Sequence, residues 1–225
     1  MKAVIKKIPF LGNFIVKFYR KIKGNSEFTT SGKYWDDRYK SGGNSGAGSF
    51  NNLAEFKGEI INKFLQSKKI ESVIEFGCGD GNQLKYFTPK KYYGYDVSNS
   101  AIKLCMKMYE NDPNKKFNLM KSYVNETAEL TMSLDVIYHL VEDQIYSDYM
   151  NKLFDASSKF VIIYSSNTDA RDLNTAHVKQ RKFTDWVEQN KTAFKLIEHI
   201  PNKYPFDGNA QRTSIADFFI YEKRE

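Results

Sequence analysis

Hydrophobic positions along the chain follow two periods, one typical of helices and one typical of strands. From residue 53, apolar residues recur at the spacing of an amphipathic helix, which predicts a helix over 53–69. Short apolar runs then indicate buried strands, separated by further helical stretches. The predicted strands are 70–76, 92–97, 116–120, 130–138, 160–164, 194–200 and 215–221, and the predicted helices among them are 82–87, 98–109, 142–156 and 182–190.

This alternation of strands and helices predicts an α/β fold with a mostly parallel sheet and helices on both faces. The last two strands follow 182–190 with no further helix, and they predict an antiparallel hairpin at one edge. A chain of 225 residues suits one such domain. We assign the domain to 53–225, preceded by a segment over 1–24 and a glycine-rich region over 25–52.

The basic charge of the chain is concentrated at its start. Residues 1–24 hold 7 of the 34 basic residues and no acidic one, so the other 27 basic residues balance the 27 acidic ones. The apolar residues of 1–24 also recur at helical spacing. This basic amphipathic pattern predicts either reversible contact with an anionic membrane or docking on the domain. We expect no nucleic acid as a partner.

Location and metal content follow from two further patterns. No apolar run reaches the roughly 20 residues needed to cross a bilayer, and lysines interrupt any signal-peptide core. The two cysteines, Cys78 and Cys105, have neither a disulfide framework nor metal-ligand spacing. We therefore expect a cytoplasmic protein, with 1–24 at the inner membrane face, and no metal site.

The most informative motif follows the strand over 70–76, where Gly77, Gly79 and Gly81 stand at alternate positions. Such a turn brings the backbone close to a ligand at the carboxyl edge of the sheet. The spacing differs from G-x-G-x-x-G, and Glu75 before it suits an amino group better than a pyrophosphate. Asp96, at the end of the next strand, can accept hydrogen bonds from ribose hydroxyls. Together they fit S-adenosylmethionine.

This arrangement resembles the class I S-adenosylmethionine-dependent methyltransferases over roughly 70–221, and Leu134-Asp135-Val136-Ile137-Tyr138-His139-Leu140 is similar to their fourth-strand motif. The resemblance implies a Rossmann-like sheet of seven strands. It also implies that the cofactor contacts Glu75, Gly77, Gly79, Asp96, Val97, Asp135 and Tyr34. Residues 34–39, 42–49 and 139–143 also resemble methyltransferases of bacterial capsule and surface-glycan pathways, which implies a small-molecule or sugar acceptor.

Methyl transfer needs a positioned acceptor and, for a hydroxyl acceptor, a base. His139 is the first candidate for this base, because the predicted fourth strand ends beside the glycine turn; a histidine that only packs there is the alternative. His177 is the second candidate, and Asp143 lies on the same edge. We expect Arg181, Arg38 and Tyr138 to contact the acceptor. Tyr34 and the glycines over 41–49 predict a lid over the cofactor, with a polar linker as the alternative.

Three other functions remain open. A nucleic-acid or protein methyltransferase would dock its large acceptor on 1–24, although no Pro-Cys pair or Asn-Pro-Pro-aromatic motif is present. A non-catalytic protein would bind S-adenosylmethionine without turnover. The glycine spacing disfavours a nicotinamide-dependent oxidoreductase.

Overall fold

The computed structural model describes residues 28–171 and 174–224. The basic segment over 1–24 lies outside these residues, so its contact with a membrane stays a prediction. None of the helices within the described ranges has the length and apolar character needed to cross a lipid bilayer.

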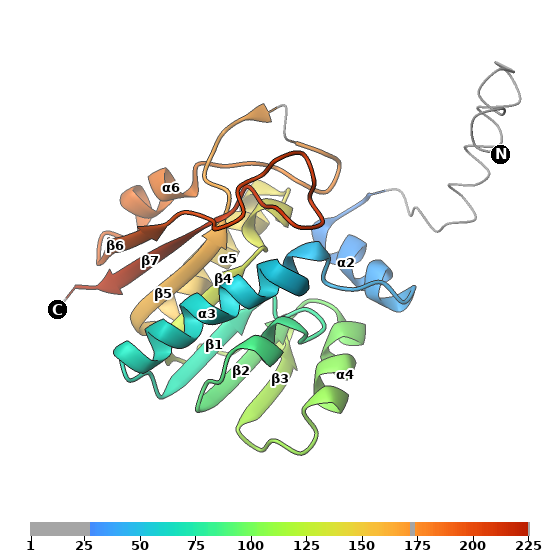
Figure 1. The fold of residues 1–225 in the computed structure, drawn as a ribbon, viewed down its shortest axis with the longest axis horizontal. Helices are drawn as coiled ribbons and strands as arrows, with labels where there is room; N and C mark the ends of the chain where they lie inside the picture. The colour runs from blue at the N-terminus through green and yellow to red at the C-terminus, as the bar shows by residue number, and fades with distance from the viewer. Residues whose placement is uncertain (1–27, 172–173, 225) are drawn as a thin grey trace, which may run out of the picture.

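The centre of the fold is a seven-stranded sheet with the strand order β3-β2-β1-β4-β5-β7-β6 (Figure 1). The first five strands are parallel, whereas β7 is antiparallel to both β5 and β6. The strands are β1 Ser72–Phe76, β2 Lys91–Asp96, β3 Lys115–Leu119, β4 Ala128–Leu134, β5 Ser157–Ser165, β6 Phe194–Ile200 and β7 Asp217–Lys223. The predicted α/β fold with an antiparallel edge is confirmed.

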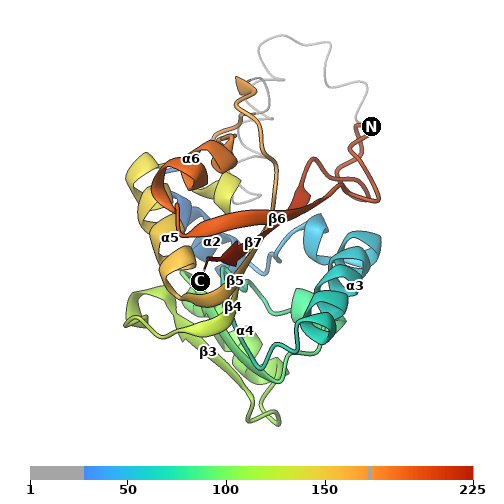
Figure 2. The same ribbon diagram turned by 90° about the vertical axis from the view of Figure 1, so that its left-hand side faces the viewer.

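Helices pack on both faces of this sheet, and each face has its own apolar core. One core joins the sheet to α3 and α4, and the other joins it to α5 and α6. Figure 2 shows α3 on one side of the strands and α5 with α6 on the other. The helices are α2 Ser31–Lys40, α3 Asn51–Ser67, α4 Asn99–Met108, α5 Asp143–Asp155 and α6 Phe183–Asn190, and the short 3₁₀ turns are η2 Ala47–Ser49, η3 Gln83–Tyr86, η4 Met120–Ser122 and η5 Ile137–His139.

Side chains of β1 alternate between the two cores, as the pleat of a strand requires. Val73 belongs to the core beneath α3, whereas Ile74 and Phe76 belong to the core beneath α5. Glu75 therefore faces α3.

Two predicted elements differ from the structure. The helix predicted over 82–87 is only the single turn η3, because the chain soon reaches Pro89, and the residue before a proline disfavours helical backbone. The fourth strand ends at Leu134 and not at residue 138. Asp135 has a φ of +60°, a left-handed conformation that ends the extended strand.

Helix α2 lies in the region that we predicted to be irregular. Thr30 caps it, because its side-chain oxygen accepts a hydrogen bond from the backbone N–H of Lys33. Ion pairs one turn apart, Lys33 with Asp37 and Lys40 with Asp36, support its exposed side. Local polar contacts and not an apolar stripe therefore define this helix, which explains why hydrophobic periodicity did not predict it.

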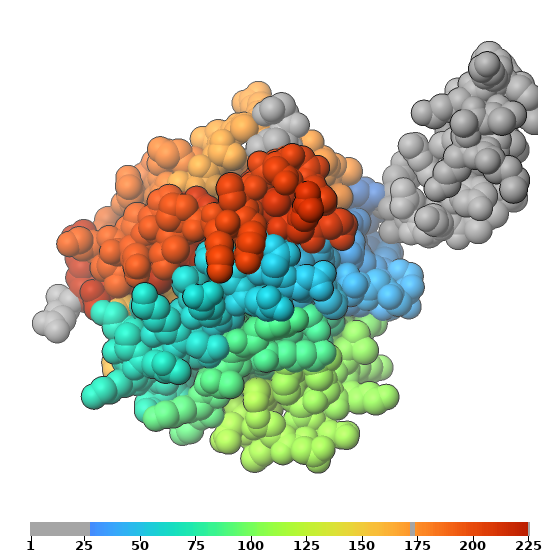
Figure 3. All heavy atoms as spheres, viewed as in Figure 1, coloured from blue at the N-terminus to red at the C-terminus, as the bar shows by residue number. Residues whose placement is uncertain are grey.

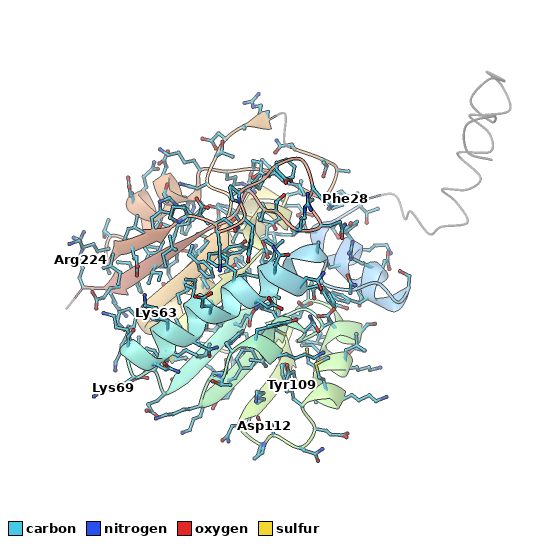
Figure 4. All side chains as sticks on the ribbon, viewed as in Figure 1. Phe28, Lys63, Lys69, Tyr109, Asp112 and Arg224 are labelled. Carbon is cyan, nitrogen blue, oxygen red and sulfur yellow. The ribbon has the colours of Figure 1, made fainter. Side chains whose placement is uncertain are left out.

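Helix α2 lies at the carboxyl edge of the parallel strands. In Figure 4, Phe28, which leads into α2, is far from Lys69 and Asp112, which precede β1 and β3 at the opposite edge. The loop between β6 and β7 packs against the start of α3, where the Asn52 side chain donates to the backbone oxygen of Arg212 at 2.9 Å. Figure 3 shows this loop beside α3 on the surface.

Candidate functional site

The turn after β1 depends on its glycines. Gly77, Gly79 and Gly81 all have positive φ, at +81°, +56° and +76°. A Cβ at Gly77 would lie 2.4 Å from a methyl carbon of Val136, and one at Gly79 would lie 2.3 Å from the Ser45 hydroxyl oxygen. Both backbone conformation and space therefore require glycine here.

This turn forms one wall of a cavity at the carboxyl edge of the sheet. The cavity has a volume of about 180 Å³ and opens to solvent at one side. Of the predicted site residues, seven line it: Glu75, Gly77, Gly79, Asp96, Val97, Asp135 and His139. Lining residues that the sequence did not indicate include Ser45, Ser49, Gln83, Met120 and Tyr149.

Two buried carboxylates, Glu75 and Asp96, face this cavity. The Tyr92 hydroxyl donates to Glu75 at 2.6 Å, while the backbone N–H groups of Gly79 and Ser98 donate to Asp96 at 2.9 and 2.8 Å. Burial raises the pKa of Glu75 to about 7 and that of Asp96 to about 6, because desolvation penalises the charged form. A cationic or hydrogen-bond-donating ligand would compensate for this penalty.

Asp135 is a third carboxylate in the cavity, and it is held by a buried lysine. Lys57 of α3 has no exposed surface, and its ammonium lies 2.6 Å from Asp135 Oδ2. The Tyr138 hydroxyl donates to Oδ1 of the same carboxylate at 2.8 Å. Sequence reasoning missed Lys57, although its spacing of four residues from both Leu53 and Ile61 places it on the buried side of α3.

The described residues that line the cavity include no lysine or arginine. Asp135 is paired with Lys57, but among the described residues Glu75 and Asp96 have no such ion pair, and they disfavour a pyrophosphate and favour a positively charged ligand. The cavity therefore agrees with the glycine spacing in disfavouring a dinucleotide.

His139 lies in η5 and not at a strand end as predicted, because β4 stops at Leu134. Its Nδ1 lies 3.0 Å from the backbone oxygen of His177. A carbonyl oxygen only accepts, so Nδ1 carries the proton and Nε2 keeps a free lone pair. Burial lowers the pKa of His139 to about 4, and the imidazole is therefore neutral near pH 7.

A stack of rings surrounds His139. The indole of Trp35 meets it edge to face, with centroids 4.9 Å apart, and the His177 ring lies parallel to it at 5.8 Å. Tyr34 stacks on the outer face of His177 at 4.6 Å, so Tyr34 is separated from the cavity that Trp35 lines. Arg38 lies over Trp35 at 5.4 Å from the ring centroid. The predicted residues Tyr34, Arg38 and His177 thus form an outer layer at this wall.

Residues 31–49, which we call the cover segment, close the cavity on the glycine-turn side. Ser45 donates from its backbone N–H and its hydroxyl to Asp80, at 3.0 and 2.8 Å, and its hydroxyl oxygen accepts the Asp80 N–H. The Tyr39 hydroxyl is 2.9 Å from the Ser45 hydroxyl. Arg38 donates to the backbone oxygen of Asn44 and so shapes the loop from within.

Helix α2 of the cover segment also bonds to both sides of the sheet edge. The Ser98 hydroxyl at the start of α4 donates to Asp36 at 2.9 Å. Ser31 donates from its backbone and its hydroxyl to Glu142, the residue before α5, at 2.9 and 2.5 Å. The helix therefore spans the cavity from the α4 side to the α5 side.

Besides Tyr34, Arg38 and His177, three more predicted site residues do not line the cavity. Arg181 donates to the backbone oxygens of Leu140 and Val141 and lies 4.3 Å from the Tyr146 ring centroid, so it supports the loop after β4. Asp143 is exposed and pairs with Arg181 at 2.8 Å. The Tyr138 hydroxyl already donates a hydrogen bond to Asp135.

Comparison with known proteins assigns the chain to a family. The sequence model of a methyltransferase domain matches residues 50–205, which is more than half of the chain. The chain belongs to this methyltransferase family. It transfers methyl groups, and the glycine turn, the three carboxylates of the cavity and His139 all lie within the matched range. A comparison with curated proteins gave no match.

Solved structures of methyltransferases share the fold. The N-methyltransferase NodS from Bradyrhizobium japonicum WM9, in complex with S-adenosyl-L-homocysteine, superposes with a TM-score of 0.68 at 13% identity, covering 88% of this chain and 100% of NodS. Magnesium protoporphyrin IX methyltransferase from Synechocystis PCC 6803 gives 0.56 at 12% identity, with 91% and 92% covered. A putative RNA methyltransferase from Pyrococcus horikoshii gives 0.56 at 14%, with 77% and 85% covered.

Proposed function

We propose that this methyltransferase transfers the methyl group of S-adenosylmethionine to a hydroxyl of a small, ring-bearing acceptor, such as a sugar of a bacterial surface-glycan pathway. The residues of the cavity fit this donor. The glycine turn lines the cavity, and the carboxylates suit a ligand with a sulfonium and an ammonium group. Neighbours of the same fold were crystallised with S-adenosylmethionine or its demethylated product.

Different lining residues would hold the two ends of the donor. Asp96 would accept hydrogen bonds from the ribose hydroxyls, as its place at the end of β2 suggests. Val97 and Met120 line the cavity next to it and give an apolar surface for adenine. Glu75, which faces α3, would lie toward the aminoacyl end. When bound, the donor supplies a methyl carbon that is activated by the positive sulfur.

The orientation of the His139 ring is the observation that supports a hydroxyl acceptor. Because the backbone oxygen of His177 fixes the proton on Nδ1, the basic Nε2 is available on a ring that lines the cavity. Nε2 would take the hydroxyl proton as the acceptor oxygen attacks the methyl carbon. The low pKa of His139 keeps the ring neutral and ready to accept this proton at neutral pH.

The wall around His139 suggests the kind of acceptor. Trp35 lines the cavity with a flat apolar surface on which a sugar or other ring can pack. Arg38 lies over Trp35, and its positive charge would favour an anionic substituent, such as a phosphate, on the acceptor. Arg181 and Tyr138 are not part of this proposal, because their polar groups are bonded within the protein. Membrane contact of residues 1–24 rests on sequence alone.

The test supplies labelled S-adenosylmethionine with polar metabolites and nucleotide sugars and identifies the methylated product by mass spectrometry. With that acceptor, His139→Gln should lower turnover by roughly 10²- to 10⁴-fold with little change in donor affinity. His199→Gln is the matched control, because His199 pairs with Asp217 on the distant edge strands. Full turnover of the His139 variant would show that the acceptor needs no base, as expected for an amine, and would overturn the assignment.

A further inference from the structure

The side chain of Gln83 has a fixed orientation beside the glycine turn. It lies in η3, and only 5% of its surface is exposed. Its amide nitrogen donates to the backbone oxygen of Ala54 in α3 at 3.0 Å. Because a backbone oxygen only accepts, the nitrogen must face α3 and the amide oxygen, Oε1, must face away from it.

This oxygen lacks a donor. Across residues 28–171 and 174–224, no hydrogen bond reaches the buried Oε1 of Gln83. Gln83 also lines the cavity, so the unpaired acceptor belongs to a residue that a ligand can touch. A buried acceptor without a partner costs stability, and a ligand that supplies an N–H or O–H group would remove that cost.

The position of Gln83 indicates which end of a ligand supplies this group. Its bond to Ala54 places it on the α3 side of the sheet, the side that Glu75 also faces. The apolar lining residues Met120, Val136 and Leu140 pack instead against the core on the α5 side. The polar end of an elongated ligand would therefore lie next to Gln83, and a flat apolar end would pack against the lining residues of the α5 side.

The acceptors on this side match one chemical group. Gln83 supplies a neutral oxygen, Glu75 supplies a carboxylate, and Asp135, held by Lys57 of α3, supplies another. Of these three acceptors, only the Gln83 oxygen has no partner within the part of the chain that the structure describes, because Tyr92 donates to Glu75 while Lys57 and Tyr138 donate to Asp135. A primary ammonium group can donate to this oxygen, and the carboxylates of the cavity favour its positive charge.

We infer that Gln83 is a specificity-determining residue that accepts a hydrogen bond from the α-ammonium group of the methyl donor. This inference rests on the proposed function, because it takes S-adenosylmethionine as the donor. Gln83 distinguishes ligands that carry the amino group from adenosine thioethers that lack it. The bond to Ala54 sets the amide in advance, so the oxygen needs no reorientation when the ligand binds.

The experiment compares three ligands by calorimetry on the full chain: S-adenosylhomocysteine, its analogue without the α-amino group, and 5′-methylthioadenosine. Gln83→Leu should weaken S-adenosylhomocysteine binding roughly ten- to hundredfold, the range for a hydrogen bond to a charged group. The affinities of the other two ligands should change much less. Asn62→Leu is the matched control, because Asn62 bonds to Tyr86 at the other end of η3 and does not line the cavity.

An equal loss for all three ligands in Gln83→Leu would show that Gln83 only supports the turn, and would overturn the inference. The same conclusion follows if Asn62→Leu gives the same ligand preference as Gln83→Leu. Failure of the wild-type protein to bind S-adenosylhomocysteine would instead refute the proposed function, and with it the identity of the ligand.

Discussion

Glu75→Gln should change how the stability of the protein depends on pH. Burial raises the pKa of Glu75 from 4.5 to about 7 in the folded chain. The folded state therefore binds this proton more tightly than the unfolded state. The resulting stability is fully present below pH 4.5 and is lost as the pH rises through 7. From these two pKa values, the loss between pH 5 and pH 8 is about 2 to 3 kcal/mol.

Glutamine cannot ionise but can still accept a hydrogen bond from the Tyr92 hydroxyl. The variant therefore loses the pH-dependent contribution of Glu75 to the free energy of unfolding and keeps the hydrogen bond. Urea unfolding of both proteins at pH 5 and pH 8 gives the four free energies of unfolding that are required. Asp96 titrates in both proteins, and its contribution largely cancels in the difference. A wild-type minus variant difference that stays within about 0.5 kcal/mol across this range would refute the reasoning, because Glu75 would then titrate as an exposed carboxyl does.

Two further predictions concern ligand binding. Affinity for S-adenosylmethionine should fall about tenfold from pH 8 to pH 6, because the cation binds ionised Glu75, whose pKa is about 7. Calorimetry at both pH values measures this change. An equal pH dependence in Glu75→Gln would contradict the prediction. Gly79→Ala should abolish measurable S-adenosylhomocysteine binding, because its Cβ would lie 2.3 Å from the Ser45 hydroxyl. Gly42 also has a positive φ, at +80°, but a Cβ there would meet nothing within 4 Å among the described atoms. Gly42→Ala should therefore bind normally, and this control separates the clash from backbone strain.

The sequence predicted those parts of the site that depend on local pattern. The succession of strands and helices along the chain follows from the apolar pattern, and the turn at Gly77 directly follows β1. Glu75 and Asp96 could therefore be assigned to one site from the sequence alone, because the carboxyl ends of neighbouring parallel strands meet at one edge.

What the sequence did not predict depends on contacts between distant residues. The end of β4 was misplaced because Asp135 adopts a left-handed backbone and pairs with Lys57, which comes from a helix far earlier in the chain. Arg181 has the right charge and lies near the right edge, but nearby backbone oxygens occupy its guanidinium. Hydrophobic periodicity carries no information about polar contacts of this kind.

The position of α2 has a consequence for the order of events in catalysis. The helix bridges α4 and α5 through Asp36 and Ser31, and it carries Trp35, a wall of the proposed acceptor site. Lifting α2 to exchange the donor would therefore also dismantle the place where the acceptor binds. Steady-state kinetics should then show a compulsory sequence, in which the donor enters first and the demethylated product leaves last.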